Sequence, residues 1–280
     1  MRSLNMACIG VGAGKSGTTW LFDQIQSHPE ISSKNPKEIN YFSRHYKDKG
    51  LDWYVDHFDD SESYRLCEFS VEYLITPGTA ERIHSTLGPV KILAVLRNPV
   101  DRLYSDFLHS IRKGDVSPDS SFEEYCLDHS RIRESKYDTL LQPYFDIFGQ
   151  ELVKVIIYEK MMAHPLATIK ELYGWLGVSD TDFQSQTLNT RVNHARLYRN
   201  IKIENIIART SRFLNNNGYS REVESLKRTG IIEVIRKLNT KDGSVQSLAP
   251  EERRNVFASF RSSISNLEIL SGLDLQSVWG

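Results

Sequence analysis

Short, almost wholly apolar runs alternate along the chain with segments in which apolar residues recur every three or four positions. The runs lie at residues 7–11, 90–96 and 152–158, with a shorter one at residues 65–69. A nearly continuous apolar run of this length is typical of a parallel strand that is covered on both faces. Helical spacing is found between the runs, at residues 18–25, 79–87, 100–111, 139–148 and 165–176. The alternation predicts an α/β fold with a central parallel sheet flanked by helices on both faces.

The pattern changes beyond residue 178. An irregular basic segment at residues 183–198 precedes helical spacing at residues 200–214, and a last amphipathic helix starts at Pro250. No internal repeat or low-complexity stretch divides the chain. We therefore predict one domain, residues 1–280, with a core at about residues 6–178 and a helical C-terminal part at about residues 179–280.

Charge and cysteine content narrow the classes of partner. A formal net charge of -1 over 280 residues gives no broad basic field, so we expect no nucleic-acid partner. Three widely spaced cysteines, Cys8, Cys67 and Cys126, supply neither a disulfide framework nor a Cys-x-x-Cys metal pair. These features predict a protein without a metal, in a reducing, cytoplasmic compartment.

No stretch approaches the roughly 18 to 20 apolar residues that cross a bilayer, so no membrane span is expected. The first six residues leave no room for a charged and then a long apolar region, so no secretory leader is expected either. The sequence carries no signal for an oligomeric state.

The most informative stretch, residues 8–27, reads CIGVGAGKSGTTWLFDQIQS. An apolar run enters a helix through a glycine-rich turn, which leaves the first backbone N–H groups of the helix without intrahelical partners. Lys15 adds a positive charge at that point, and Ser16, Thr18 and Thr19 add hydroxyl groups. The stretch therefore predicts a phosphate-binding loop, although a glycine turn without a ligand is the simpler alternative.

Two kinds of phosphate loop are compatible with this turn. A nucleoside-triphosphate P-loop needs a glycine where this chain has Ile9. Residues 15–20, KSGTTW, instead resemble the 5′-phosphosulfate loop of sulfotransferases that use 3′-phosphoadenosine 5′-phosphosulfate (PAPS).

A second motif follows the apolar run at residues 90–96. Residues 97–105, RNPVDRLYS, resemble the 3′-phosphate motif of the PAPS sulfotransferases, in which an arginine at a strand end and a serine hold one phosphate. The resemblance assigns these roles to Arg97 and Ser105. A triphosphate P-loop protein is expected to end such a strand in an acidic residue that holds Mg²⁺, and here Arg97 follows Leu96.

A third motif, residues 36–42, reads PKEINYF and resembles the Lys-Glu-x-x-Phe-Phe stretch of glycan sulfotransferases of the heparan sulfate type. The resemblance implies that Glu38 is the general base toward the acceptor and that Lys15 stabilises the leaving phosphate. It also places His109, four residues after Ser105, near the reacting centre. A solvated loop carboxylate at position 38 and a packed histidine at position 109 are the alternatives.

The resemblance implies a P-loop-like three-layer fold with a helical C-terminal extension. It implies transfer of a sulfuryl group from PAPS to a hydroxyl or amine of an acceptor, a carbohydrate or a small hydroxylated metabolite. The residues expected to bind PAPS are Lys15, Ser16, Gly17, Thr18, Thr19, Trp20, Arg97 and Ser105. A P-loop nucleoside-triphosphate kinase and a nucleotide-binding module without catalysis are the alternatives.

The chain also departs from the glycan enzymes. They usually place a lysine where this chain has Phe69, and Arg112 or Lys113 could substitute for it. Arg196 and Tyr198 are candidates for contacts with adenine, on a looser match. Residues 267–279 resemble the tail of bacterial members of the family.

Overall fold

The computed structural model describes residues 4–32, 37–58, 65–117, 119–188 and 248–280, and the short pieces 197–198, 210, 234–235 and 240–241. Arg196 and the side chain of Tyr198 lie outside the described part of the chain, as does the expected helix at residues 200–214 apart from residue 210. The remaining candidate residues lie within it.

Five parallel strands form the central sheet, in the order β2-β3-β1-β4-β5. Their bounds are β1 (Met6–Gly12), β2 (Ile31–Ser32), β3 (Arg65–Phe69), β4 (Ile92–Leu96) and β5 (Val153–Ile157). All four runs identified in the sequence are strands of this sheet, and the two-residue β2 is its one strand that the sequence did not predict. The predicted parallel α/β sheet is confirmed.

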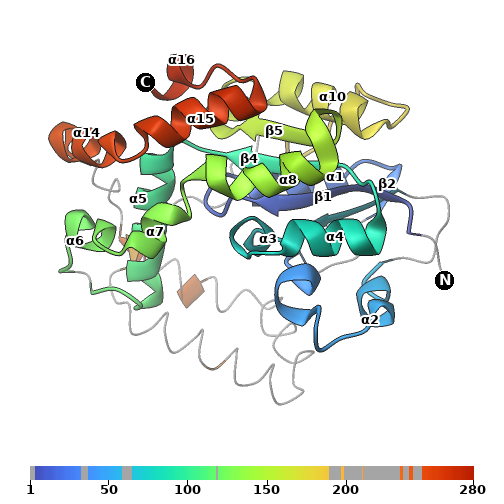
Figure 1. Cartoon of the computed structure of the whole chain (residues 1–280), viewed down its shortest axis with the longest axis horizontal. Coiled ribbons are helices and arrows are strands. Elements are labelled where there is room, and N and C mark those ends of the chain that lie inside the picture. Colours follow the sequence, from blue (N-terminus) through green and yellow to red (C-terminus); the bar gives the residue numbers. More distant parts are fainter. Residues whose placement is uncertain are drawn as a thin grey trace.

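Helices cover both faces of the sheet, which confirms the three-layer arrangement (Figure 1). Alternate residues of β4 show why both faces are apolar. Ile92 and Leu96 belong to one core cluster, whereas Leu93 belongs to the other. The first cluster packs against α4 (Thr79–Leu87), α5 (Pro99–Lys113), α8 (Tyr137–Leu152) and α15 (Arg261–Ser271), and the second against α1 (Thr18–Gln26) and α10 (Pro165–Leu176).

Shorter elements complete the described part. They are η1 (Tyr41–His45), α2 (Leu51–Val55), α3 (Glu72–Ile75), α6 (Phe122–Cys126), α7 (His129–Arg133), α9 (Tyr158–Ala163), α14 (Pro250–Ala258), α16 (Gln276–Trp279), and an antiparallel pair of β6 (Leu197–Tyr198) and β7 (Thr240–Lys241). The described residues 250–280 lie mainly in the helices α14, α15 and α16, whereas β6 and β7 are short strands within the C-terminal part. None of the helices in the described ranges is long and apolar enough to cross a membrane.

The carboxyl ends of β1, β3, β4 and β5 lie at one edge of the sheet because all these strands are parallel. In an open parallel sheet, ligands bind outside this edge. The glycine-rich loop follows β1 there, and Arg97 follows β4. Asn98 then begins α5, because its side-chain oxygen accepts hydrogen bonds from the N–H groups of Val100 and Asp101, at 3.0 and 3.4 Å.

Gly10 leads to a stability prediction for the sheet. It lies opposite Phe69 in the pairing of β1 and β3, and an added Cβ would lie 2.2 Å from the Phe69 ring. Gly10→Ala should therefore lower the free energy of unfolding by about 1–3 kcal/mol through overpacking. In urea titrations, we expect a clear loss of stability.

The matched control is Gly174→Ala, in α10. No atom lies within 4 Å of an added Cβ there, and alanine favours a helix interior by about 0.5–1 kcal/mol. The control should be as stable as the wild type or more so. Equal stability of Gly10→Ala and the wild type would contradict the close packing at Gly10.

Candidate active site

The loop between β1 and α1 has a fixed, unusual backbone. Lys15 and Gly17 both adopt left-handed conformations, with φ of 70° and 78°. Gly17 precedes α1, and an added Cβ would lie 2.8 Å from the ring of Tyr158. Because α1 starts at Thr18, the N–H groups of its first turn have no partner within the helix. The loop thus presents backbone donors at the positive end of the helix dipole.

Ser16 shows what kind of ligand fits this loop. Its side chain is fully buried, and its Oγ has no hydrogen-bond partner among the described residues. An unsatisfied buried hydroxyl is unfavourable by about 1–3 kcal/mol. An anionic oxygen in the loop would accept its proton, so the residues present fit a phosphate or sulfate group.

Lys15 adds the charge that such a group requires. Burial is the main reason why the pKa of Lys15 is lowered to about 8; Asp106 opposes this shift, and the positive charges of Arg112, Lys113 and Arg102 add to it. The cations near Lys15 therefore outnumber the anions. This imbalance favours a negatively charged ligand.

His109 lies close to the same centre. Burial lowers the pKa of His109 to about 4, and the next largest cause is the charge of Lys15. The imidazole is therefore neutral at pH 7 and can donate or accept a hydrogen bond there. Ser105, which is half-buried, lies one turn earlier on the same face of α5.

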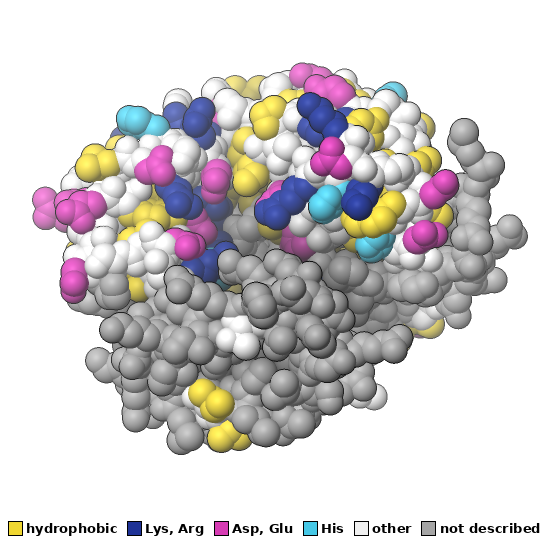
Figure 2. Space-filling view, turned by 90° about the horizontal axis from the view of Figure 1, so that it is seen from below, with side chains coloured by type: hydrophobic (Ala, Val, Ile, Leu, Met, Phe, Trp, Pro, Cys, Tyr) yellow, Lys and Arg dark blue, Asp and Glu magenta, His cyan; other side chains and the backbone are white. Residues whose placement is uncertain are grey.

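The two predicted anion sites are contiguous. Arg97 donates a hydrogen bond from Nη1 to the carbonyl oxygen of Lys15, at 3.3 Å. Its guanidinium lies 4.9 Å from the ring centroid of Tyr158, the same ring that packs against Gly17. The backbone of Arg97 is held in turn by the hydroxyl of Tyr137, 3.0 Å from its carbonyl oxygen. The loop and the Arg97 side chain are therefore in direct contact. Figure 2 shows Lys and Arg side chains gathered around a hollow on the face seen from below, with Asp and Glu side chains among them.

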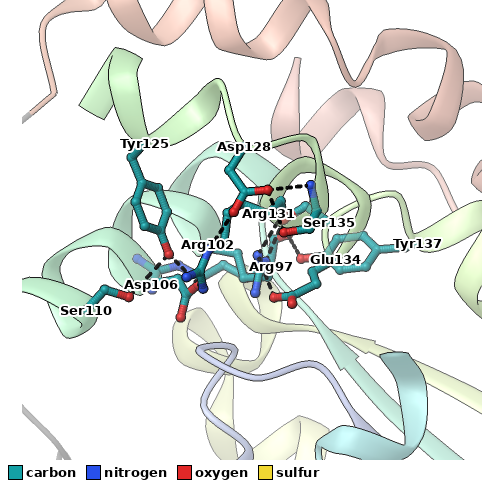
Figure 3. A network of polar contacts seen from close by, with 11 residues as sticks. Arg97, Arg102, Asp106, Ser110, Tyr125, Asp128, Arg131, Glu134, Ser135 and Tyr137 are labelled. Carbon is teal, nitrogen blue, oxygen red and sulfur yellow. Dashed lines mark hydrogen bonds and ion pairs between the residues drawn. The ribbon is translucent and has the colours of Figure 1, made fainter. Parts of the chain in front are cut away.

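A polar network next to these residues holds α5 in place (Figure 3). Asp106 accepts a hydrogen bond from the Tyr125 hydroxyl at 2.9 Å. Arg102 is buried, donates to Ser135 Oγ at 2.5 Å and lies 3.8 Å from a carboxylate oxygen of Glu134. Arg102, although part of the RNPVDRLYS motif, therefore holds α5 against the residues that lead into α8.

Glu38 is presented from the segment before η1, in a left-handed conformation with φ of 70°. One carboxylate oxygen accepts the N–H of Val71 at 2.8 Å, and the other accepts from Lys37 Nζ at 3.0 Å. Lys37 Nζ also donates to Thr18 Oγ1 at 3.2 Å. Because Lys37 bridges Glu38 and the loop, the predicted base lies beside the predicted phosphate site. One third of the Glu38 side chain is exposed, so a substrate can reach it.

The candidates differ in how much of each side chain faces the site. Thr19 is half-buried, whereas Trp20 is 4% exposed and packs in the core beneath α1, so only its backbone N–H is available to a ligand.

Sequence reasoning missed Lys37 as a bridge and Tyr158 as the support of Arg97. Tyr158 directly follows β5, so the rule about strand ends, applied to that strand, could have found it.

The C-terminal residues help to hold Asn98, which directly follows Arg97 and begins α5. The carboxylate of Glu159 accepts the N–H of Asn98 at 2.8 Å and the indole N–H of Trp279 at 3.0 Å. Asn98 Nδ2 in turn lies 3.4 Å from the carbonyl oxygen of Trp279. The start of α5 is therefore fixed by the end of the chain.

The chain matches a known protein family. The model of a family described as the sulfotransferase domain matches residues 8–233 of the chain. This range includes the glycine-rich loop, Glu38, Arg97 and His109.

Two curated relatives are named as sulfotransferases. The membrane-associated sulfotransferase kil1 of Dictyostelium discoideum is 37% identical over 135 residues, which are 45% of this chain and 28% of that protein. The bifunctional heparan sulfate N-deacetylase/N-sulfotransferase 1 of Mus musculus is 27% identical over 199 residues, 64% of this chain and 23% of that protein. Each match spans less than a third of the relative's length.

Solved structures share the fold. A sulfotransferase from Alicyclobacillus acidocaldarius is 25% identical, with a TM-score of 0.69, over 97% of this chain and 98% of that one. Mouse sulfotransferase SULT7A1, solved in complex with PAP, is 14% identical with a TM-score of 0.52, over 99% and 89% of the two chains. The second likeness concerns the fold alone.

The lowered pKa of Lys15 leads to a prediction about its reactivity. An ordinary lysine has a pKa of about 10.4, whereas the pKa of Lys15 is about 8. We expect acetylation of Lys15, followed peptide by peptide with mass spectrometry, to reach half its maximal rate near pH 8. Saturating sulfate should move this midpoint upward, because an anion favours the ammonium form. A midpoint at the ordinary lysine value would contradict the buried, cation-rich setting.

Proposed function

The chain belongs to the sulfotransferase family, and from this membership we propose that it transfers the sulfuryl group of PAPS to a hydroxyl or amine of an acceptor, releasing adenosine 3′,5′-bisphosphate. The observation that carries the proposal is the contact between Arg97 and the carbonyl oxygen of Lys15. It joins two anion sites into one surface, which suits a nucleotide with phosphate groups at both its 5′ and 3′ positions.

We assign the two ends of the donor as follows. The backbone N–H groups of the loop, the unsatisfied Ser16 hydroxyl and the Lys15 ammonium would hold the 5′-phosphosulfate. Arg97 and Ser105 would hold the 3′-phosphate by charge-assisted hydrogen bonds. Gly17, Thr18, Thr19 and Trp20 would contribute chiefly through the backbone of the first turn of α1.

The proposed chemistry uses three side chains. Glu38 takes the proton from the acceptor, because its carboxylate is partly exposed beside the loop. Lys15 stabilises negative charge on the leaving phosphate. His109, neutral at pH 7, would hold an oxygen of the transferred or leaving group by a hydrogen bond. The donor supplies the activated sulfuryl group.

We propose a carbohydrate or a small hydroxylated metabolite as the acceptor. The lysine that the glycan enzymes carry at position 69 is absent here, but Lys37 Nζ lies 5.6 Å from the centroid of the Phe69 ring. Position 37 thus supplies a positive charge close to the one that is missing. Arg112 and Lys113, whose positive charges lower the pKa of Lys15, are further candidates for acceptor contacts. A cytoplasmic location stays a prediction.

The alternative of a triphosphate kinase is less well supported. At the end of β4, the place of an acidic Mg²⁺ ligand is taken by Arg97. A nucleotide-binding module without catalysis would bind adenosine 3′,5′-bisphosphate but sulfate no acceptor.

The catalytic roles can be tested by two substitutions. Glu38→Gln and Lys15→Ala should each lower turnover at least about 10²-fold, the usual effect of losing a positioned base or an electrostatic stabiliser. Transfer of radiolabelled sulfate from PAPS to a panel of sugars and small alcohols provides the measurement. Glu38→Gln should retain its affinity for adenosine 3′,5′-bisphosphate, whereas Lys15→Ala should lose it in part. Full activity of both variants would reject the assignment.

Calorimetric titration tests the donor site. The wild type should bind adenosine 3′,5′-bisphosphate more tightly than ATP with Mg²⁺, and Arg97→Ala should weaken that binding by at least about tenfold, since hydrogen bonds between charged groups contribute about 1.5–3 kcal/mol. Arg82→Ala is the matched control, because this arginine of α4 contacts carbonyl oxygens of Pro77 and Gly78. Tighter binding of ATP with Mg²⁺ would favour the kinase.

A further inference from the structure

Glu68 is a buried carboxylate that the proposed chemistry does not use. It is the fourth of the five residues of β3, and its exposed fraction is 2%. Removing a carboxylate from water is unfavourable by several kcal/mol unless polar partners compensate. Glu68 is thus a buried charge in a strand whose other buried residues, Leu66, Cys67 and Phe69, are not charged.

Three hydroxyl groups donate to this carboxylate. Ser70 Oγ and the hydroxyl of Tyr73 lie 2.8 and 2.5 Å from Oε1, and the hydroxyl of Tyr54 lies 2.7 Å from Oε2. Within the described ranges, Glu68 forms no ion pair with a lysine or an arginine. Hydrogen bonds from three neutral hydroxyl groups therefore stabilise the charge of Glu68.

Two of these hydroxyls face the segment that carries Glu38. Ser70 Oγ accepts the N–H of Asn40 at 3.0 Å, and the Tyr73 hydroxyl oxygen accepts the N–H of Phe42 at 3.3 Å. The Glu38 N–H donates to the carbonyl oxygen of Phe69 at 3.0 Å. The N–H groups of residues 38, 40 and 42 are therefore all bound by the end of β3 and the residues that follow it.

This segment needs such support. Glu38 and Asn40 both have positive φ, 70° and 55°, which non-glycine residues rarely adopt. A residue in such a sparsely populated conformation is unfavourable, and the conformation persists only where the surrounding structure fixes it. The three hydrogen bonds from the segment to the β3 side supply that constraint.

The charge of Glu68 sets the direction of the hydroxyl protons. A hydroxyl has one proton, so when Ser70 or Tyr73 donates to Glu68, its lone pairs are free to accept from Asn40 or Phe42. A protonated Glu68 would have to donate to one of its partners. The hydrogen bonds from Ser70 and Tyr73 to Glu68 would then no longer be charge-assisted, and the weaker bonds would hold the two hydroxyls less firmly in the positions that accept from Asn40 and Phe42.

We propose that Glu68 is the positioning residue for Glu38: through the hydroxyls of Ser70 and Tyr73 it holds the backbone of residues 38–42 in the conformation that presents the base. The inference rests on the proposed function, in which Glu38 takes the proton from the acceptor. Glu68 itself lies too deep to touch a substrate.

The surroundings of Glu68 also make its support of residues 38–42 sensitive to pH. Burial is the main reason why the pKa of Glu68 is raised to about 7; the hydrogen bonds from Tyr73, Tyr54 and Ser70 oppose this shift, and the charge of Glu38 adds to it. The titratable groups that face it are Tyr54 from α2, Tyr73 from α3, Glu38 from the segment before η1 and Cys67 on its own strand. Glu68 is ionised above this pKa, so kcat should fall as the pH falls through about 7.

Two buried tyrosines provide a matched pair for the test. Tyr73→Phe and Tyr54→Phe each remove one donor to Glu68, but only Tyr73 relays to the segment 38–42. We expect Tyr73→Phe, Ser70→Ala and Glu68→Gln to lower kcat at least tenfold, with the KM for PAPS changed less than twofold. Tyr54→Phe should keep the kcat plateau within about twofold and move its acid limb to higher pH, because a donor to the carboxylate is lost.

Hydrogen exchange of the full chain supplies a readout that needs no acceptor. Amide protection of Asn40 and Phe42 should fall at least tenfold in Tyr73→Phe, Ser70→Ala and Glu68→Gln, and stay within twofold in Tyr54→Phe. Equal protection in Tyr73→Phe and Tyr54→Phe, or loss of protection with kcat unchanged, would overturn the role of Glu68. If Glu68→Gln does not fold, the Tyr73 and Ser70 variants decide the question. A wild type that sulfates no acceptor would refute the proposed function instead, while the exchange comparison would still decide whether the hydroxyls hold the segment.

Discussion

The site depends on the meeting of two strand ends. The sheet is parallel, so the loop after β1 and the arginine after β4 come to the same edge, and the Arg97 side chain contacts the carbonyl oxygen of Lys15. Tyr158, from the end of β5, packs on both Arg97 and Gly17. Three adjacent strand ends thus bring donors and positive charge together before any ligand arrives. Such preorganisation is what an anionic donor requires, because little has to move when it binds.

A second segment brings the base to this edge. Residues 38–42 lie against the end of β3, and Lys37 connects Glu38 to Thr18 of the loop. Lys15, Glu38 and Asn40 are the non-glycine residues with positive φ in the described part of the chain. Unfavourable backbone conformations cluster at functional sites, where the surrounding structure fixes them. Here two of the three belong to the residues assigned to the chemistry.

The fold and the outline of the site could be predicted from the sequence because both follow local patterns. Strands covered on two faces read as apolar runs, and the bounds of α4 and α10 agree with the expected helices at residues 79–87 and 165–176. The glycine-rich turn identified Lys15 and its loop, and the strand-end rule identified Arg97.

Other parts of the site depend on contacts that no local pattern encodes. Trp279 reaches Glu159 across 120 positions of the sequence, and the ring of Tyr158 meets Gly17 only in the folded sheet. The position of Arg102 within a phosphate motif gave no sign that its partners are Ser135 and Glu134. Glu68 was not identified from the sequence, because its three hydroxyl partners come together only in the fold.

We infer that the Lys15 loop and Arg97 together hold both ends of one doubly phosphorylated adenosine. The most direct measurement compares, by calorimetry, the affinities for adenosine 3′,5′-bisphosphate, adenosine 5′-monophosphate and adenosine 3′-monophosphate. Two adjoining sites predict that the bisphosphate binds at least about 10²-fold more tightly than either monophosphate, since each charge-assisted contact contributes about 1.5–3 kcal/mol. Equal affinities for the bisphosphate and one of the monophosphates would contradict the account.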